Sequence, residues 1–428
     1  MKLEDFGIER QETILSNGVK LILFNRKGMP VNIRVSFLAG SRFDQIGKEG
    51  SAHFLEHMLV AGTKNFPTKD KLAAYIEQYG GGFSAFTSGD WMDVNVAIGD
   101  PSNVNCMTDV LHEMLLEPLF EEKTLETERG SILKELGDKK SNPGSMIWEV
   151  WRKLFFQGTM LGRSILGSEQ SINSITKTDI LDFYKKKILS GRMVLVASGG
   201  VNLSDLKKKI EEKVMFTESL NKATSFNNLP ILRDTPVSIE VYKERDQVHM
   251  IFGFRSVSEF HADVPILDVM AEVIGGGRAS ALQKRLRYEK GLVYSVGARQ
   301  QTFSDCGTWT VNTSTSKDKV NEVLNFVVEE LKRVCDQGLT TEEVKFARDK
   351  IEKSKRMEMQ TSSSWVSFHS FRELLDDKNT WTLSDYVAEI KSVTPEMTHR
   401  VAQKYFGPDK WYLAICGDVE ESEIKINW

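Results

Sequence analysis

Apolar and polar residues alternate along several short stretches of the first half of the chain, a pattern typical of strands. Between Glu12 and Phe24 the alternation is interrupted by Ser16-Asn17-Gly18, and Asn-Gly is a strong hairpin signal. This stretch therefore predicts two strands joined by a tight turn. The stretches from Val31 to Leu38, from Phe83 to Val96 and from Met193 to Ala197 predict further strands.

Stretches with helical spacing lie between these strands. Thr68 is a suitable N-cap for a helix from Lys69 to Tyr79, and Ser102 for a following helix whose apolar residues recur every three or four positions. A longer helix is predicted from about Glu121 to Lys140, with further helical segments past Trp151 and over Lys177 to Lys187.

The second half of the chain repeats features of the first. Ser392-Val393-Thr394 repeats Ser174-Ile175-Thr176, and the strand-like stretch from Trp411 to Val419 repeats the one ending at Val201. The helix that follows Ser316 repeats the one that follows Ser102, and the offset stays between 214 and 218 positions. We therefore predict an α+β fold of two homologous domains, each a mostly antiparallel sheet with helices packed on one face.

A polar stretch separates the two halves. Met215 to Pro236 is rich in Ser, Thr and Asn, contains two prolines, and is typical of a linker. The predicted boundaries are an N-terminal domain over residues 1–214, a linker over 215–236 and a C-terminal domain over 237–428.

Composition narrows the function classes. The formal net charge of −4 over 428 residues gives no overall electrostatic reason to expect a nucleic-acid partner. No apolar run approaches the length of a membrane span, and the acidic first residues do not resemble a targeting signal. The four cysteines lie far apart without a C-x-x-C pair, which argues against a disulfide framework or a thiolate metal site. We expect a soluble cytoplasmic protein without a membrane partner.

The stretch with the clearest chemistry is His53-Phe54-Leu55-Glu56-His57. In a helix, residues four apart share a face, so His53 and His57 can direct two imidazoles at one point. Two neutral imidazoles are half of a typical zinc site, and Glu56 beside them can act as a base without being a ligand. The pattern H-x-x-E-H is a known metallopeptidase signature.

A zinc site needs a third protein ligand from another element. The predicted helix from Glu121 to Lys140 carries Glu128 and Glu135, which are seven apart and therefore share a face. Other acids nearby are more typical of a solvated surface. Spacing alone does not determine which glutamate reaches the metal.

The second half does not repeat this motif. At an offset of 218, His53, His57 and Glu135 correspond to Ala271, Gly275 and Lys353. At an offset of 215, the two histidines correspond to Asp268 and Glu272. In either register only the first half carries the metal residues.

Taken in order along the chain, these motifs resemble those of the zinc peptidases of the insulinase and pitrilysin type. The likeness is greatest to the small branch that includes the mitochondrial processing peptidase and its bacterial relatives. In the first half it is carried by Gly40-Ser41-Arg42-Phe43-Asp44, by Ala52 to Met58, and by Glu128-Arg129 with Leu133-Lys134-Glu135. In the second half it is carried by Gly275-Gly276-Gly277, Leu286-Arg287 and Gly291-Leu292-Val293-Tyr294-Ser295-Val296.

The resemblance implies a role for individual residues. His53, His57 and Glu135 match the three zinc ligands, and Glu128 matches an acid that supports the site. Arg287 and Tyr294 match a pair that helps to hold and polarise the substrate. Ser84 and Ala85 occupy the place where the family usually has Asn-Ala; Ser84 departs from that pattern with a shorter side chain, which affects a substrate contact but not the metal set.

The resemblance further implies a zinc-dependent metalloendopeptidase with one Zn²⁺ per chain and Glu56 as general base. The expected substrates are unfolded peptides or leader and presequence segments, added as a strand near Phe83 to Ser88. A homodimer is the simplest assembly, because one chain carries both the metal motif and the Arg287/Tyr294 pair; a heterodimer with a related chain is the other possibility. The alternative function is a non-catalytic structural or partner-dependent subunit of a peptidase-like assembly.

Overall fold

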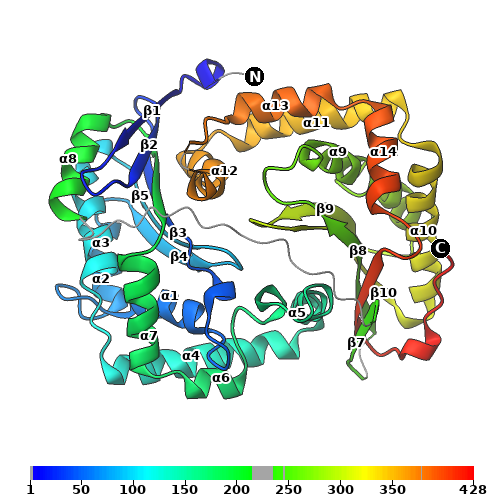
Figure 1. Cartoon of the computed structure of the whole chain (residues 1–428), viewed down its shortest axis with the longest axis horizontal. Coiled ribbons are helices and arrows are strands. Elements are labelled where there is room, and N and C mark those ends of the chain that lie inside the picture. The colour runs from blue at the N-terminus through cyan, green and yellow to red at the C-terminus, as the bar shows by residue number, and fades with distance from the viewer. Residues whose placement is uncertain (1–2, 215–234, 244–245, 377) are drawn as a thin grey trace. The chain divides into compact units, whose positions relative to one another are not determined.

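The computed structural model describes residues 3–214, 235–243, 246–376 and 378–428, which form two compact units (Figure 1). Neither unit is a continuous segment. The first unit contains the described residues of 1–136, 163–225 and 356–384, and the second those of 137–162, 226–355 and 385–428. Each unit thus takes one segment from the opposite half, which the predicted boundaries do not include. The predicted linker over 215–236 lies outside the described residues except for Thr235 and Pro236.

The first unit is built on a six-stranded sheet in the order β1-β2-β6-β3-β5-β4, in which only the β2–β6 pairing is parallel. The predicted hairpin around Asn17 is confirmed, since Ile14 on β1 lies opposite Lys20 on β2. The stretch predicted from Phe83 to Val96 is a hairpin of two strands. The strands are β1 (Glu9–Ile14), β2 (Lys20–Asn25), β3 (Val31–Phe37), β4 (Gly82–Thr87), β5 (Met92–Ile98) and β6 (Met193–Gly199).

Helices of the first unit pack their apolar residues into one core with the sheet. They are α1 (Ser51–Ala61), α2 (Lys69–Glu77), α3 (Val104–Leu116), α4 (Glu122–Ser141), α6 (Glu169–Ser174), α7 (Lys177–Phe183) and α8 (Leu203–Lys213). The predicted cap at Ser102 is wrong. Asp100 instead accepts a hydrogen bond from the Ser102 backbone, and a 3₁₀ turn leads into α3. Asp and Ser are both common cap residues, so their order in the chain does not show which one caps.

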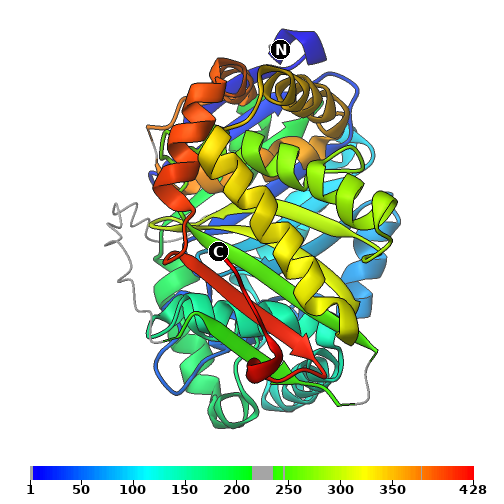
Figure 2. The same cartoon turned by 90° about the vertical axis from the view of Figure 1, so that its right-hand side faces the viewer.

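The second unit is built on a five-stranded sheet in the order β7-β11-β8-β10-β9. Figure 2 shows β11, in red, between two green strands of this sheet. The strands are β7 (Val237–Val241), β8 (Gln247–Ser256), β9 (Val296–Thr302), β10 (Gly307–Ser316) and β11 (Trp411–Gly417). The helices are α9 (Val264–Ile274), α10 (Val320–Gln337), α11 (Thr341–Glu358), α13 (Leu383–Ser392) and α14 (Pro395–Tyr405).

The two sheets correspond strand by strand, as the repeated sequence features predict. The order β2-β6-β3-β5-β4 in the first unit matches β7-β11-β8-β10-β9 in the second, including the single parallel pairing between the first two strands. The register of one hairpin is the same in both. Thr87 lies opposite Met92 in the first unit, and Thr302 lies opposite Gly307, each 215 positions later, in the second. The α+β fold of two homologous domains is confirmed.

One helix of each half packs in the other unit. The first half supplies α5 (Pro143–Phe155), which covers a face of the second unit's sheet through Tyr412, Ala414 and Cys416. These residues alternate along β11 with Leu413 and Ile415, which face the main core of that unit. The second half supplies α12 (Ser362–Leu375), which packs on β6 and β3 of the first unit. Most helices therefore lie on one face of each sheet, as predicted. In addition, each sheet is covered by one helix from the opposite half of the chain, and we call α5 and α12 the exchanged helices.

Candidate metal centre

Helix α1 begins at a buried and tightly packed point. Its N-cap, Gly50, has a φ of +98°, and a Cβ atom there would collide with the carbonyl of Leu166. The carboxylate of Asp44 accepts hydrogen bonds from the backbone N–H groups of Gly50 at 2.8 Å and Ala52 at 2.9 Å. Burial raises the pKa of Asp44 to about 7, although these two N–H groups lower it. Asp44 therefore satisfies donors that the first turn of the helix leaves without partners.

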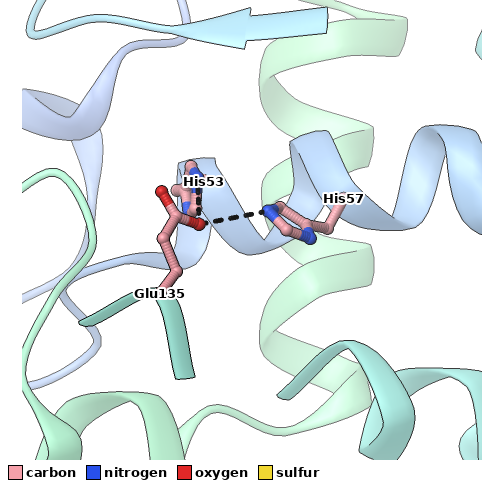
Figure 3. Close-up of side chains that lie close together, drawn as sticks. All are labelled: His53, His57 and Glu135. Carbon is pink, nitrogen blue, oxygen red and sulfur yellow. Dashed lines mark ion pairs between the residues drawn. The ribbon is translucent and has the colours of Figure 1, made fainter. Parts of the chain in front are cut away.

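His53, Glu135 and His57 converge on one point (Figure 3). The Nε2 atom of His53 lies 3.7 Å from Oε2 of Glu135, and Nε2 of His57 lies 3.8 Å from the same oxygen. His53 is buried, whereas the Glu135 side chain is 48% exposed. The two rings come from successive turns of α1 and the carboxylate from α4, so the group joins two helices.

Glu128 lies on the other side of the second histidine. Its Oε2 is 2.8 Å from Nδ1 of His57, so this ring is held by a carboxylate at Nδ1 while Nε2 faces Glu135. Spacing put Glu128 and Glu135 on one face of a helix without choosing between them, and in the structure they face different nitrogens. A carboxylate on the remote nitrogen fixes the ring's orientation and raises its basicity as a ligand.

Arg129, which the sequence did not single out for the site, fastens α4 beside α1. Its guanidinium lies 5.3 Å from the ring centre of Phe54, the residue after His53. It also donates hydrogen bonds to the carbonyl oxygens of Ile172 and, at 2.9 Å, Ile175. These contacts fix the helix next to the one that carries both histidines.

The donor set fits a zinc ion. Two imidazole nitrogens and one carboxylate oxygen are a common ligand set for catalytic zinc, which keeps a further position open. Ligand atoms about 2.1 Å from a tetrahedral ion lie about 3.4 Å from one another. The three donors lie within 4.8 Å of one another, so small side-chain adjustments would bring them to that spacing.

Glu56 adjoins this group on α1. Burial raises the pKa of its carboxyl group, and the negative charge of Glu135 raises it further. The polar groups of Thr87 and the neighbouring His57 act in the opposite direction. Thr87 ends β4, so the hairpin strand β4 runs beside the helix that carries the histidines.

Ser84 and Ala85 lie on β4, the last strand of the sheet among the described residues. Their side chains alternate. Ala85 packs against the core that includes α1, whereas Ser84 is exposed on the opposite face. Of these two side chains, only that of Ala85 therefore lies on the face of β4 that packs against the core with α1.

Arg287 and Tyr294 lie in the second unit and contact each other. The Arg287 guanidinium lies 4.9 Å from the ring centre of Tyr294 and 5.7 Å from that of Tyr288. Tyr294 is 77% exposed. The half-buried Arg287 and the exposed Tyr294 thus form one cationic and aromatic group, on a segment between α9 and β9.

Two further features bear on the class of protein. The four cysteines are free thiols. Across the part of the chain that the structure describes, no helix is both long and apolar enough to cross a membrane.

Comparison with known proteins adds a family assignment. Residues 22–169 match the family model described as insulinase (peptidase family M16), and residues 174–351 match the one described as peptidase M16 inactive domain. An uncharacterized zinc protease of Bacillus subtilis is 26% identical over 92% of this chain and 95% of its own length. The β subunit of the mouse mitochondrial-processing peptidase is 27% identical over 96% and 85%, respectively.

Solved structures show the same fold. A protease from Helicobacter pylori superposes with a TM-score of 0.85 at 17% identity, covering 96% of this chain and 99% of its own. A chain from Pseudomonas fluorescens, titled as a peptidase M16 inactive domain, gives a TM-score of 0.86 at 17% identity, with the same coverage.

Proposed function

The chain belongs to the insulinase family of peptidases, M16, and from this premise we propose that it is a zinc-dependent endopeptidase. The observation that carries the proposal is the approach of His53 Nε2 and His57 Nε2 to one oxygen of Glu135, at 3.7 and 3.8 Å. The relatives named as zinc proteases support zinc as the metal. We propose that these three residues hold one Zn²⁺ per chain.

The proposed chemistry is hydrolysis of a peptide bond. When bound, zinc supplies Lewis acidity, which acidifies water and polarises a carbonyl group. Glu56, which follows the first ligand by three positions on α1, accepts the proton of the attacking water and delivers it to the leaving amine. Glu128 keeps the His57 ring oriented through its 2.8 Å contact to Nδ1.

The proposed substrate is an unfolded peptide or a leader or presequence segment. β4 is the last strand of its sheet among the described residues, and its end at Thr87 adjoins Glu56. An extended peptide can add to such an edge through backbone hydrogen bonds, which read little sequence. Ser84 and Ala85 would take part through their backbone groups. Arg287 and Tyr294 would contact the substrate and stabilise developing negative charge.

A second function has support from the comparisons. Part of the chain matches the model of an inactive domain, and the mouse relative is named as one subunit of a peptidase. A non-catalytic or partner-dependent subunit would fit these names. The presence of Glu56 beside a convergent His53, His57 and Glu135 favours catalysis. Homodimer and heterodimer both remain proposals for the assembly.

The test uses Glu56→Gln, which keeps the side chain's size but removes the base. We expect one zinc per chain in both the native protein and the variant, by elemental analysis. Peptide cleavage, read by mass spectrometry on a mixed peptide library, should fall by about 10²–10⁴-fold in the variant. Glu122→Gln, at an exposed glutamate in the first turn of α4, is the matched control and should cleave normally.

Two results would contradict the proposal. A native protein that retains full zinc but cleaves no peptide, alone or mixed with a related chain, is not a peptidase. Cleavage that survives in Glu56→Gln would remove Glu56 as the base. Cleavage only after a second chain is added would instead identify a partner-dependent enzyme.

A further inference from the structure

The second unit contains a counterpart of each residue in the metal centre. The hairpin β9–β10 lies 215 positions after β4–β5 with the same register, and α9 packs on β9 as α1 packs on β4. With the same offset, Asp268 and Glu272 on α9 correspond to the two histidines, and Lys350 on α11 corresponds to Glu135. The position of Glu56 is taken by Ala271, so the proposed base is lost as well.

Two of these counterparts contact each other directly. The Lys350 ammonium group forms an ion pair with the Glu272 carboxylate and joins α11 to α9. His57 and Glu135, their counterparts, likewise bring α1 and α4 together. The side chain of Glu272 is only 17% exposed. The ammonium group of Lys350 therefore supplies a positive charge between two helices at the place where a metal ion fits in the first unit.

The same ammonium group holds a glycine turn. Lys350 Nζ donates a hydrogen bond to the carbonyl oxygen of Gly276 at 2.6 Å. A Cβ atom at Gly277, where φ is +155°, would collide with Lys350 Nζ, and one at Gly276 would collide with Glu272. The ion pair thus fills the space that side chains on Gly276 and Gly277 would need.

This turn begins the segment that carries Arg287 and Tyr294. The Ser280 backbone N–H donates to Gly277 at 3.0 Å, and Lys284 donates to Ser280 at 3.0 Å, which leads into the π-helical turn over Gln283–Glu289. The segment is closed by the Leu292 backbone, which donates to Leu286 at 2.8 Å. Hydrogen bonds therefore hold the chain from the glycine turn at Gly276 to Lys284, in the π-helical turn that also contains Arg287.

We propose that Glu272 and Lys350 are positioning residues: their ion pair replaces a metal cross-link in the second unit and fixes the segment of Arg287 and Tyr294. An effect of the ion pair on substrate binding rests on the proposed function, in which Arg287 and Tyr294 contact the peptide. An effect of the ion pair on the order of the segment does not depend on that function. Removing the cation leaves Glu272 partly buried without its partner and frees the Gly276 carbonyl, which loosens the turn.

The test compares Lys350→Met with Lys391→Met. Lys391 also joins α11 to another helix, through a 2.7 Å ion pair with Glu352, so its loss is a matched control away from the turn. Hydrogen exchange of residues 275–294 should rise about tenfold in Lys350→Met and stay unchanged in Lys391→Met. Lys350→Arg, which keeps the cation, should restore protection. Glu272→Gln, a smaller change, should give a weaker effect of the same sign.

Peptide kinetics give the second readout. In Lys350→Met we expect zinc content unchanged at one per chain and kcat/KM lowered about three- to tenfold, because Arg287 and Tyr294 act on both the bound peptide and the developing charge. Unchanged exchange over 275–294 would overturn the positioning role, whatever the activity. Raised exchange with unchanged kcat/KM would overturn the link to substrate. If hydrogen exchange over 275–294 rises in Lys350→Met but the native protein itself cleaves no peptide, the positioning role stands and the proposed function is refuted.

Discussion

At the level of single residues, the candidate metal centre depends on side chains that hold the proposed ligands in place. His57 contacts a carboxylate at each ring nitrogen, Glu128 at 2.8 Å and Glu135 at 3.8 Å. Arg129, next to Glu128, fastens the helix through the ring of Phe54. A ligand oriented in this way loses little conformational freedom when it binds an ion, which favours affinity.

Asp44 is the residue whose removal tests this idea most directly. Asp44→Ala leaves the N–H groups of Gly50 and Ala52 buried without an acceptor, one residue before His53. We expect a loss of about 1–3 kcal/mol in the free energy of unfolding. Because the first turn of α1 also carries the proposed ligand His53, zinc affinity should fall about tenfold or more.

The control for Asp44→Ala is Asp179→Ala. Asp179 accepts a hydrogen bond from the Thr176 backbone at 2.8 Å in the capping box of α7, a helix without metal residues. Asp179→Ala should lower the free energy of unfolding by a similar amount, but a competition titration should show unchanged zinc affinity. Equal effects of the two variants on zinc affinity would show that Asp44 acts through stability alone.

The sequence predicted part of this site. The spacing of His53 and His57 places them on one helical face, and the structure brings both next to Glu135. The sequence could not separate Glu128 from Glu135, because a spacing of seven gives a shared face but not the nitrogen that each acid reaches. The capping role of Asp44 was not predicted from the sequence. Asp44 lies six positions before Gly50, the N-cap of α1, and therefore matches no local capping pattern.

At the level of elements, the exchanged helix α12 is held by a buried ionic cluster. Glu373 accepts hydrogen bonds from Arg10 and from Lys20, each at 3.0 Å, and from Asn379 at 3.1 Å. The Glu373 side chain is fully buried. Removing one partner of such a cluster is costly because the remaining charge stays buried. The cluster therefore fixes α12 in one register on the first unit's sheet.

The same helix carries a histidine that should make the first unit sensitive to acid. His369 is fully buried, and its ring stacks on Phe24 with ring centres 4.3 Å apart. Burial, together with the positive charges of Arg10 and Arg372, lowers the pKa of His369 to about 3. Between pH 6.5 and 3 the unfolded chain takes up a proton that the folded chain does not. Stability therefore falls as the pH falls through this range.

His369→Phe should remove this contribution. Between pH 7 and pH 4, His369 should lower the free energy of unfolding of the native protein by about 3 kcal/mol. The difference in this free energy between the native protein and the variant should change by the same amount. The measurement is denaturant unfolding of both metal-free proteins from pH 7 to pH 4. Metal-free protein is required because metal binding is itself pH-dependent and would add its own contribution to stability. Parallel pH profiles for the two proteins would contradict the prediction.

The helices and strands themselves were largely predictable, but the exchange of α5 and α12 was not. Alternation predicted the hairpin of β1 and β2, and helical spacing predicted α4 to within two residues at each end. An amphipathic pattern shows which face of a helix is apolar, but not which sheet covers that face. The apolar residues of α5 could pack on either sheet, so only the folded chain shows that Trp151 lies with Tyr412 of the second half.

At the level of the whole molecule, duplication explains both the likeness of the units and their division of labour. The first unit carries the three proposed ligands and the proposed base, and the second has an ion pair and Ala271 at the same places. Such a pair needs no metal supply, and the cross-link between helices remains. Loss of chemistry in one copy is therefore compatible with retention of its fold.

The exchange of helices also predicts how the chain behaves when it is divided. A fragment of residues 1–225 contains the first half but lacks α12. Trp365, Val366 and Leu374 are almost fully buried on the first unit, and so is Met359 just before α12. Their burial contributes about 6–12 kcal/mol, comparable with the stability of a whole domain, about 5–15 kcal/mol. The fragment alone should therefore lack a cooperative unfolding transition and bind zinc weakly.

Co-expression of residues 1–225 with residues 226–428 should restore the fold, because the second fragment supplies α12 and receives α5 from the first. We expect a one-to-one complex on size exclusion with one bound zinc. As a control, Glu373→Ala in the second fragment removes the acceptor for Arg10 and Lys20 and should weaken the complex. A fragment of 1–225 that unfolds cooperatively and binds zinc with native affinity would contradict the prediction. It would mean that α12 covers the first sheet without being needed to fold it.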